Sequence, residues 1–170
     1  MERKKNIFNL RLINALLFIS LFLVQYNGVL NIKIFTATPM LTLALLVAIC
    51  MFCSELRGAL TGLVVGVFID TVASTPQGFN AIIFCVLSLI SVLITKYLFN
   101  NNILSALTLC ALCSMFYFII RWIFCLGFSL SFTENLTYIM GTVFPSVLYT
   151  CVFIIPFYYL EKFLYKRFFQ

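Results

Sequence analysis

Residues 58–70 read Gly-Ala-Leu-Thr-Gly-Leu-Val-Val-Gly-Val-Phe-Ile-Asp. Gly58, Gly62 and Gly66 recur at every fourth position, so they share one face of a helix. Asp70 continues the same spacing and ends this face. A helix face without side chains lets another backbone come close, and such contact is a main source of packing energy between helices in a bilayer. The segment therefore predicts a tightly packed helix with a carboxylate at the end of its packed face.

The sequence on both sides of this segment is strongly apolar. Of the 170 residues, 64% are hydrophobic and 9% are charged, and the mean hydropathy is +1.12. A soluble protein of this composition would expose large apolar patches, so we predict an integral membrane protein. Runs of about 20 apolar residues can cross a bilayer. We predict an all-α protein with a single transmembrane domain and six spans, near residues 12–30, 37–53, 58–72, 79–98, 103–122 and 136–160.

The basic residues predict how the chain is oriented. They precede the first span, follow the second and the sixth, or end the fourth: Arg3, Lys4, Lys5, Arg11, Arg57, Lys96, Lys162, Lys166 and Arg167. The positive-inside rule places them in the cytoplasm with both termini, while Lys33 falls on the opposite side. The net charge of +6 is therefore a topology signal. Scattered basic residues disfavour a nucleic-acid interface and favour weak attraction to anionic lipids.

Asp70 allows several interpretations. A charge at bilayer depth costs roughly 2.5 to 3.5 kcal/mol, so it needs a partner or a wet cavity. The helical rise places Asp70 and Arg121 in the same half of the layer, where the two side chains can pair. Alternatively, Arg121 points outward beside Trp122. Asp70 then ends its helix or hydrogen-bonds to the backbone at the second outer loop, contacts a partner chain, or lines a polar cavity.

Two cysteine pairs raise the question of a metal site. Cys50 with Cys53 and Cys110 with Cys113 have Cys-x-x-Cys spacing. A structural zinc site needs four ligands on turns, whereas these cysteines lie in apolar helical runs. We therefore interpret them as small buried hydrophobic residues. The chain contains no histidine that would activate a cysteine nucleophile.

The remaining polar residues give no catalytic pattern. No second carboxylate lies near Asp70 in the sequence, and the glycines have helical spacing rather than that of a phosphate-binding loop. Glu55 and Arg57 suggest a solvated local ion pair. We predict that the protein is not an enzyme and has no catalytic residue, cofactor or metal ion.

The run from Gly62 to Asp70, followed by Gly-Phe-Asn-Ala at residues 78–81, resembles a known family signature. The bacterial rod shape-determining protein MreD family reads roughly Gly-aromatic-x-x-Gly-Leu-x-x-Asp and then Gly-x-x-Ala. Here Leu63 replaces the usual aromatic residue and Val67 replaces the usual leucine. In size and topology the resemblance extends over most of the chain.

This resemblance implies a fold similar to the substrate-binding subunits of energy-coupling-factor transporters. It implies a non-catalytic scaffold of the cell-elongation complex in the bacterial cytoplasmic membrane, which regulates cell shape and lateral peptidoglycan synthesis. The implied partners are MreC directly, MreB indirectly, and the RodA polymerase with a class B penicillin-binding transpeptidase. The residues expected in packing or partner contact, from the motif and from the spacing together, are Gly58, Gly62, Gly66, Asp70, Gly78 and Arg121.

Two other function classes stay open beside the scaffold. A substrate-binding subunit of a vitamin transporter would carry an Ala-x-x-x-Ala pair on its first span, whereas Ala44 and Ala48 lie on the second. A small membrane enzyme acting on lipid-linked substrates would use Asp70 as an acid or a base. We expect the scaffold, because a packing motif is present without a catalytic pattern.

Overall fold

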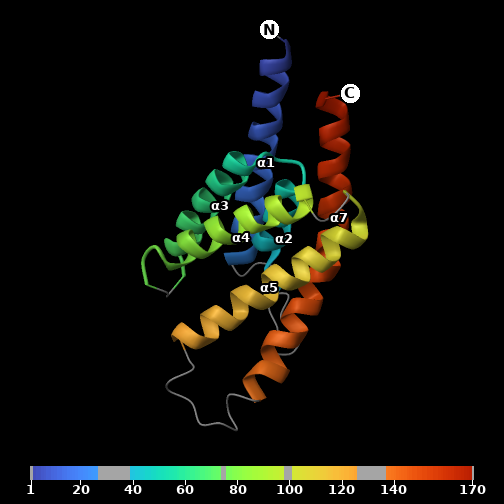
Figure 1. Cartoon of the computed structure of the whole chain (residues 1–170). Coiled ribbons are helices and arrows are strands. Elements are labelled where there is room, and N and C mark those ends of the chain that lie inside the picture. Colours follow the sequence, from blue (N-terminus) through green and yellow to red (C-terminus); the bar gives the residue numbers. More distant parts are fainter. Residues whose placement is uncertain (1, 27–38, 74–75, 98–100, 126–136, 170) are drawn as a thin grey trace.

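The structure, a computed structural model, describes residues 2–26, 39–73, 76–97, 101–125 and 137–169. All regular secondary structure in these ranges is helical, as predicted. The elements are α1 (Glu2–Tyr26), α2 (Leu41–Cys50), α3 (Glu55–Asp70), α4 (Phe79–Tyr97), α5 (Ile103–Cys125), the π-helix η1 (Ile139–Val143) and α7 (Phe144–Phe169) (Figure 1). Lys33 and several ends of the predicted spans, at residues 27–30, 37–38, 98 and 136, lie outside the described residues.

Three helices in the described part are long and apolar enough to cross a membrane: Phe79–Tyr97, Ile103–Phe124 and Ile139–Phe168. They correspond to the predicted fourth, fifth and sixth spans. The apolar part of α1, Leu12–Tyr26, is shorter, and α3 has 16 residues. Sixteen helical residues measure about 24 Å against a hydrocarbon layer of about 30 Å. The chain is therefore a membrane protein with three helices of membrane length, and the six-span arrangement stays a prediction.

Helix α2 is the centre of the molecule. All 10 of its residues are buried, and it contacts each of the other five α-helices. Other helices satisfy its first N–H groups: Met40 N–H donates to Thr150 Oγ1 at 3.2 Å, and Thr42 N–H donates to Gln25 Oε1 at 3.1 Å. Ten residues measure about 15 Å, half of the hydrocarbon layer. The apolar run predicted as a span at 37–53 therefore contains a short core helix, which hydropathy does not distinguish from a lipid-facing one.

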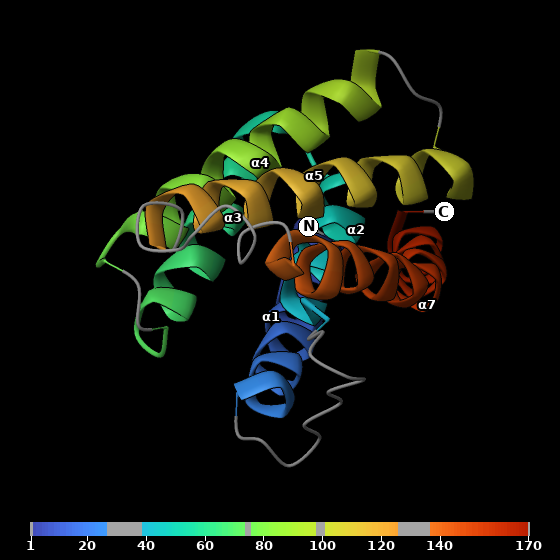
Figure 2. The ribbon, with the colours of Figure 1, turned by 90° about the horizontal axis from the view of Figure 1, so that it is seen from below.

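The helices run in two main directions. Helix α1 lies beside α7, and the start of α1 and the end of α7 lie at the same end of the molecule (Figure 1). Helices α3, α4 and α5 cross α1 obliquely, as a second view also shows (Figure 2). Helices α3 and α4 form an antiparallel hairpin with the most extensive pairing in the structure, and α5 packs alongside α4. This hairpin positions most of the residues that the sequence singles out.

Helix α7 is long and bent. It extends to Phe169, beyond the predicted end near residue 160, and contains Pro156. Figure 2 shows its C-terminal part almost end-on, while its N-terminal part lies across the view. Proline removes an intrahelical hydrogen bond and crowds the preceding turn, so the bend has a local cause. The π-helix η1 precedes Pro145, another residue without an N–H group.

Candidate functional site

Two glycines bring the backbones of α3 and α4 into direct contact. A Cβ atom at Gly66 would overlap Ala81 Cα and the Asn80 carbonyl oxygen. A Cβ atom at Gly62 would overlap the Phe84 carbonyl oxygen and a nearby serine side chain. Because these obstacles include backbone atoms, they cannot move aside without separating the helices. Only glycine therefore fits at these two positions.

Gly58 lies on the same face, near the start of α3. A Cβ atom there would come 2.5 Å from Val92 Cγ2, so the obstacle is a side chain rather than the backbone of α4. All three glycines of the face are buried. The glycine face therefore lies against α4, and the backbone of α4 comes closest at Gly62 and Gly66, the two glycines nearer to Asp70.

Asp70 ends α3 and caps α4. Its Oδ1 accepts a hydrogen bond from the Asn80 N–H at 3.1 Å, and its Oδ2 accepts one from the Ala81 N–H at 3.0 Å. Gly78 precedes α4 with a φ of +86°, and the Ile82 N–H donates to its carbonyl at 3.1 Å. Gly78 is therefore the N-cap residue, but it has no side chain to accept a hydrogen bond. Asp70 supplies that acceptor from another helix and places its charge at the positive end of the α4 dipole.

The start of α4 is fully hydrogen-bonded. Beside the three N–H groups just described, the Phe79 N–H donates to the Pro76 carbonyl at 3.1 Å. The first four N–H groups of a helix have no partner within it, and at depth in a bilayer each unpaired group costs several kcal/mol. The cap therefore accounts for the carboxylate at the end of the apolar part of α3.

Asn80 extends the cap to α5. Its Nδ2 donates to Asp70 Oδ1 at 2.8 Å, and its Oδ1 accepts a hydrogen bond from the Tyr117 hydroxyl at 3.0 Å. Asn80 is 0% exposed and Tyr117 is 1% exposed, and the Tyr117 ring meets Phe84 edge-on at a centroid distance of 5.4 Å. Buried polar groups that satisfy one another rigidify their surroundings. We call the following residues together the hairpin joint: Gly58, Gly62, Gly66, Asp70, Gly78, Asn80 and Tyr117.

Arg121 takes no part in the joint. It is exposed, and both carboxylate oxygens of Asp70 are engaged by α4, so the structure lacks the Asp70–Arg121 pair that the sequence allows. The alternative prediction, that Asp70 ends its helix or hydrogen-bonds to the backbone at the second outer loop, describes the contact in kind. The backbone donors, however, belong to the first turn of α4 rather than to the loop. The predicted ion pair between Glu55 and Arg57 is not formed. Glu55 Oε1 instead lies 2.6 Å from Lys96 Nζ, at the end of the hairpin opposite to Asp70.

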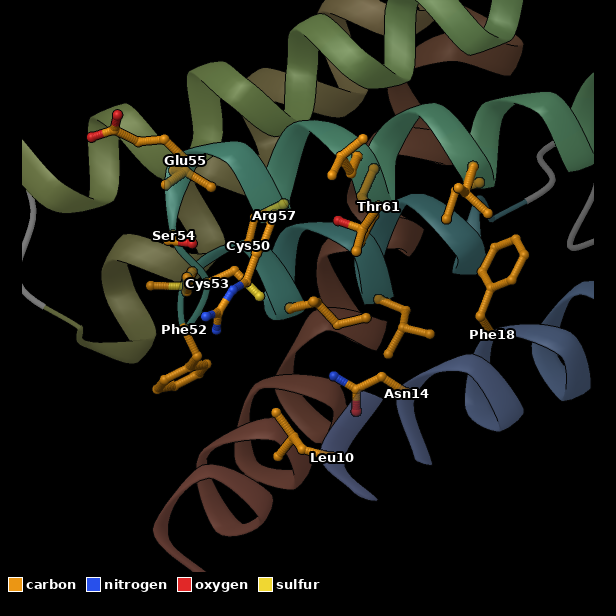
Figure 3. A pocket seen from close by; sticks show the side chains of 18 of the residues that line it. Leu10, Asn14, Phe18, Cys50, Phe52, Cys53, Ser54, Glu55, Arg57 and Thr61 are labelled. Atoms are coloured by element: carbon orange, nitrogen blue, oxygen red, sulfur yellow. The ribbon is translucent and has the colours of Figure 1, made fainter. Parts of the chain in front are cut away.

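A groove of about 1270 Å³ lies between α1 and α3, with α2 as its floor (Figure 3). Its walls and floor are mainly apolar and include Phe18, Ile19, Leu46, Leu60, Val64 and Phe68. Its polar lining gathers at the ends of α3 and α4 and includes Ser54, Glu55, Arg57, Thr95, Lys96 and Asn101. The groove is therefore most polar at this end and mainly apolar along the rest of its length, where Thr61 and Asn14 add single polar groups.

Glu161 is a buried carboxylate in α7 beside this groove. It is 2% exposed, and its Oε2 accepts a hydrogen bond from Asn14 Nδ2 of α1 at 3.3 Å. Glu161 Oε1 and Asn14 Oδ1 have no hydrogen-bond partner among the described atoms. Asn14 also lines the groove. The pair therefore joins α1 to α7 at the back of one groove wall.

The described ranges contain no cluster of three or more His, Cys, Asp or Glu side chains suited to a metal ion. Cys50, Cys110 and Cys113 are buried in helices, as predicted, and Cys113 Sγ lies 3.3 Å from Ser91 Oγ. Cys53, predicted in the same apolar helical run as Cys50, instead lies half-buried in the turn after α2. The carboxylates of α3 and α7 engage separate partners. The arrangement therefore offers a rigid joint and an amphipathic groove as its two functional features.

Sequence reasoning missed four polar residues of these sites. Asn80 had a signal, since it is a polar residue in the first turn of an apolar helix that follows Gly78. Asn14 and Tyr117 are single polar groups in apolar runs, where nothing marks a partner. Glu161 lies just beyond the predicted sixth span, among basic and aromatic residues, and therefore resembles part of a membrane-interface anchor.

The residues that carry the resemblance to the MreD family all lie in or against the hairpin joint. Gly62 and Gly66 permit the backbone contact, Asp70 caps α4 and Gly78 is its N-cap residue. Ala81 donates its N–H to Asp70 and packs against Gly66. In comparisons with known proteins, the chain matches no family model, no curated protein and no solved structure.

Proposed function

We propose that this chain is a non-catalytic membrane scaffold of the MreD type, acting in the cell-elongation complex of a bacterium. The observation that carries the proposal is the use of Asp70. Both of its oxygens accept hydrogen bonds from α4, and Asn80 links them to α5. A catalytic acid or base must reach a substrate proton, whereas this carboxylate is occupied by its own chain. Its role in this proposal is to hold three helices in one arrangement.

The outer faces of the hairpin are suited to contact with other membrane helices. Leu63 and Val67 of α3 and Ile82 and Val86 of α4 are between 43% and 68% exposed. In a bilayer such faces meet lipid or another helix through van der Waals contact. The joint fixes the spacing of the two helices and hence of these faces. We propose that they receive the membrane helices of partner proteins.

The proposal includes the six-span arrangement, the fold similar to energy-coupling-factor substrate-binding subunits, and cytoplasmic termini. The distribution of basic residues supports this orientation. So does the location of the start of α1 and the end of α7 at the same end of the molecule. The proposed partners are MreC directly, MreB indirectly, and RodA with a class B penicillin-binding transpeptidase. These names rest on the resemblance of residues 62–70 and 78–81 to the family signature.

Depletion and co-purification test the function. In a rod-shaped host, depletion of the chain is expected to widen and round the cells. The tagged chain in mild detergent is expected to recover the MreC protein of the host. Unchanged cell width together with no recovered MreC would overturn the proposal. Thermal stabilisation by a small vitamin would favour the transporter subunit instead.

Surface variants test whether the hairpin is the partner surface. Val86→Trp adds bulk to an exposed position of α4, so it is expected to lower the recovery of MreC several-fold at unchanged thermal stability. Leu148→Trp adds the same bulk on α7, where the side chain is 55% exposed. This control is expected to retain full recovery. Equal losses from both variants would contradict partner contact through the hairpin.

A further inference from the structure

The groove between α1 and α3 belongs neither to the hairpin joint nor to the partner surface proposed above. We propose that it binds an anionic phospholipid, with the phosphate group at Arg57 and one acyl chain along the apolar walls. This inference goes beyond the scaffold function. It rests on the shape and charge of the groove and, for the choice of leaflet, on the predicted orientation of the chain. Neither depends on the partner proteins, so the scaffold function can fail while lipid binding holds.

The size of the groove suits a lipid better than a small polar metabolite. Its volume of about 1270 Å³ exceeds the roughly 300 to 1000 Å³ of pockets that hold drug-sized ligands. Leu60, Val64 and Phe68 line it and are about half exposed, so the groove is open along α3. In a bilayer an open apolar trough is filled either by an acyl chain or by another helix.

The length of the groove favours an acyl chain over a helix. The α3 wall of the groove runs from Glu55 to Phe68, and the eleven helical steps from Arg57, where the phosphate is placed, to Phe68 measure about 16 Å. One leaflet contributes about half of the 30 Å hydrocarbon layer, roughly 15 Å. A single acyl chain therefore spans the trough, whereas a transmembrane helix needs twice this length.

The polar end of the groove carries a positive charge. Lys96 is paired with Glu55 at 2.6 Å, so Arg57, Lys96 and Glu55 together leave a net charge of +1 (two cations and one anion). Arg57 is exposed, makes no salt bridge within the described residues, and points into the groove (Figure 3). The N-terminal end of α3 adds the positive end of its dipole. A monoanionic phosphate group complements this charge.

The location of the polar end fits the leaflet in which anionic lipids act. It lies next to α1, whose residues before Asn14 include several basic ones: Arg3, Lys4, Lys5 and Arg11. Arg57 and Lys96 also belong to the predicted cytoplasmic side. The cytoplasmic leaflet has a negative surface potential, and basic pockets between membrane helices on this side bind anionic head groups. One anionic phospholipid therefore matches both the positive charge at the polar end of the groove and the apolar walls along the rest of it.

Lipid retention measured on the full chain tests the proposal. The chain is purified, exposed to equal amounts of phosphatidylglycerol and phosphatidylethanolamine, and the retained lipid is counted by native mass spectrometry. The wild-type chain is expected to retain phosphatidylglycerol preferentially. Arg57→Gln is expected to lower that retention about fivefold, the effect of about 1 kcal/mol for one basic contact. Arg121→Gln, which changes an exposed arginine outside the groove, is the matched control and is expected to retain the wild-type preference.

A second variant tests the apolar part of the site. Val64→Trp fills the trough and is expected to lower the retention of both lipids, while Val86→Trp on α4 leaves retention unchanged. Melting temperatures near that of the wild type show that each variant is folded. Equal effects of Arg57→Gln and Arg121→Gln, or no preference in the wild type, would overturn the proposal. So would a photo-crosslinker at position 64 that captures a protein helix in native membranes instead of lipid.

Discussion

Helix α3 has two apolar faces that meet their neighbours in opposite ways. Toward α4 it presents Gly62 and Gly66, and the two backbones touch. Toward α1 it presents Leu60, Val64 and Phe68, and a groove remains. Both faces are apolar, so hydrophobicity does not explain the difference. Where a helix presents glycines, the backbone of its neighbour can touch it directly and no space remains between the two helices. Where it presents bulky side chains, the helices stay farther apart and leave space that another molecule can fill.

The largest loss of stability is expected from a methyl group added to the glycine face of α3, where it touches α4. Gly66→Ala should lower the free energy of unfolding by on the order of 3 kcal/mol, because the new Cβ overlaps backbone atoms of α4. Gly141→Ala is the matched control, since a Cβ there meets no atom within 4 Å. Apparent melting temperatures in detergent compare the two. Equal stability of both variants would refute the closed contact.

Removal of the trans cap should have the next largest effect. Asp70→Ala leaves two N–H groups of α4 and the Asn80 amide without their acceptor, which should cost about 2 kcal/mol. Asp70→Asn keeps one acceptor oxygen and should lose less. Hydrogen exchange at the start of α4 measures the effect locally. Unchanged protection at Asn80 and Ala81 would contradict the capping role.

The link to α5 should contribute less than the cap. Tyr117→Phe removes the hydroxyl that donates to Asn80 Oδ1 and should cost about 1 kcal/mol. Tyr159→Phe changes a tyrosine that is 56% exposed and serves as the control. Thermal unfolding of the two variants in the same detergent gives the comparison. A destabilised Tyr159→Phe with an unchanged Tyr117→Phe would remove α5 from the joint.

Near the groove, removal of the buried carboxylate of Glu161 in α7 should stabilise the protein. Glu161→Gln supplies an amide that can donate to Asn14 Oδ1, and it removes a buried charge with one hydrogen bond. We expect a gain of about 1 kcal/mol in the free energy of unfolding. Glu161→Ala, which leaves a cavity and an unpaired Asn14, should destabilise. A marked loss of stability in Glu161→Gln would show that the carboxylate itself is required.

The smallest effect is expected at the solvent-exposed end of the hairpin. Glu55→Gln removes the ion pair with Lys96, whose side chains are 42% and 57% exposed. Exposed ion pairs lose side-chain entropy and are screened by salt, so the melting temperature should not change measurably. A clear decrease at low salt that vanishes at high salt would instead assign this pair a role in closing the hairpin.

The glycine face illustrates what the sequence predicts well. The four-residue spacing of Gly58, Gly62 and Gly66 predicts a face open to a close neighbour, since the helical period alone determines which residues share a face. The glycine spacing does not identify the neighbouring helix, because the backbone of any helix can pack against a glycine face. The contact with α4 follows from the short connection between the two helices, which makes an antiparallel hairpin.

Asp70 illustrates where charge alone misleads. A carboxylate in an apolar helix suggests a basic partner, and Arg121 lies at a similar depth. Its partners are instead neutral donors on α4, which need an acceptor because Gly78 has no side chain. The sequence contains this information in the glycine that precedes Phe79, but only an inventory of the unpaired N–H groups at a helix start reveals it.

Helix α2 and the groove show what sequence patterns do not encode. The run 37–53 is as apolar as a span, and hydropathy does not report that Leu41–Cys50 is surrounded by other helices. The groove arises where α1 and α3 diverge over α2, a relation between helices far apart in the sequence. Its apolar residues are ordinary ones and its polar residues come from separate segments of the sequence, so only the three-dimensional arrangement identifies the site.

The trans cap also bears on how the chain enters the bilayer. On its own, α3 carries a carboxylate with no donor, at an insertion cost of roughly 2.5 to 3.5 kcal/mol. Its donors are the backbone N–H and the side-chain amide of Asn80 and the backbone N–H of Ala81, which are synthesised ten and eleven residues later. The ribosome therefore delivers the charge and its donors almost together. In the proposed six-span arrangement, α3 and α4 would therefore leave the translocon laterally as one paired unit rather than one after the other.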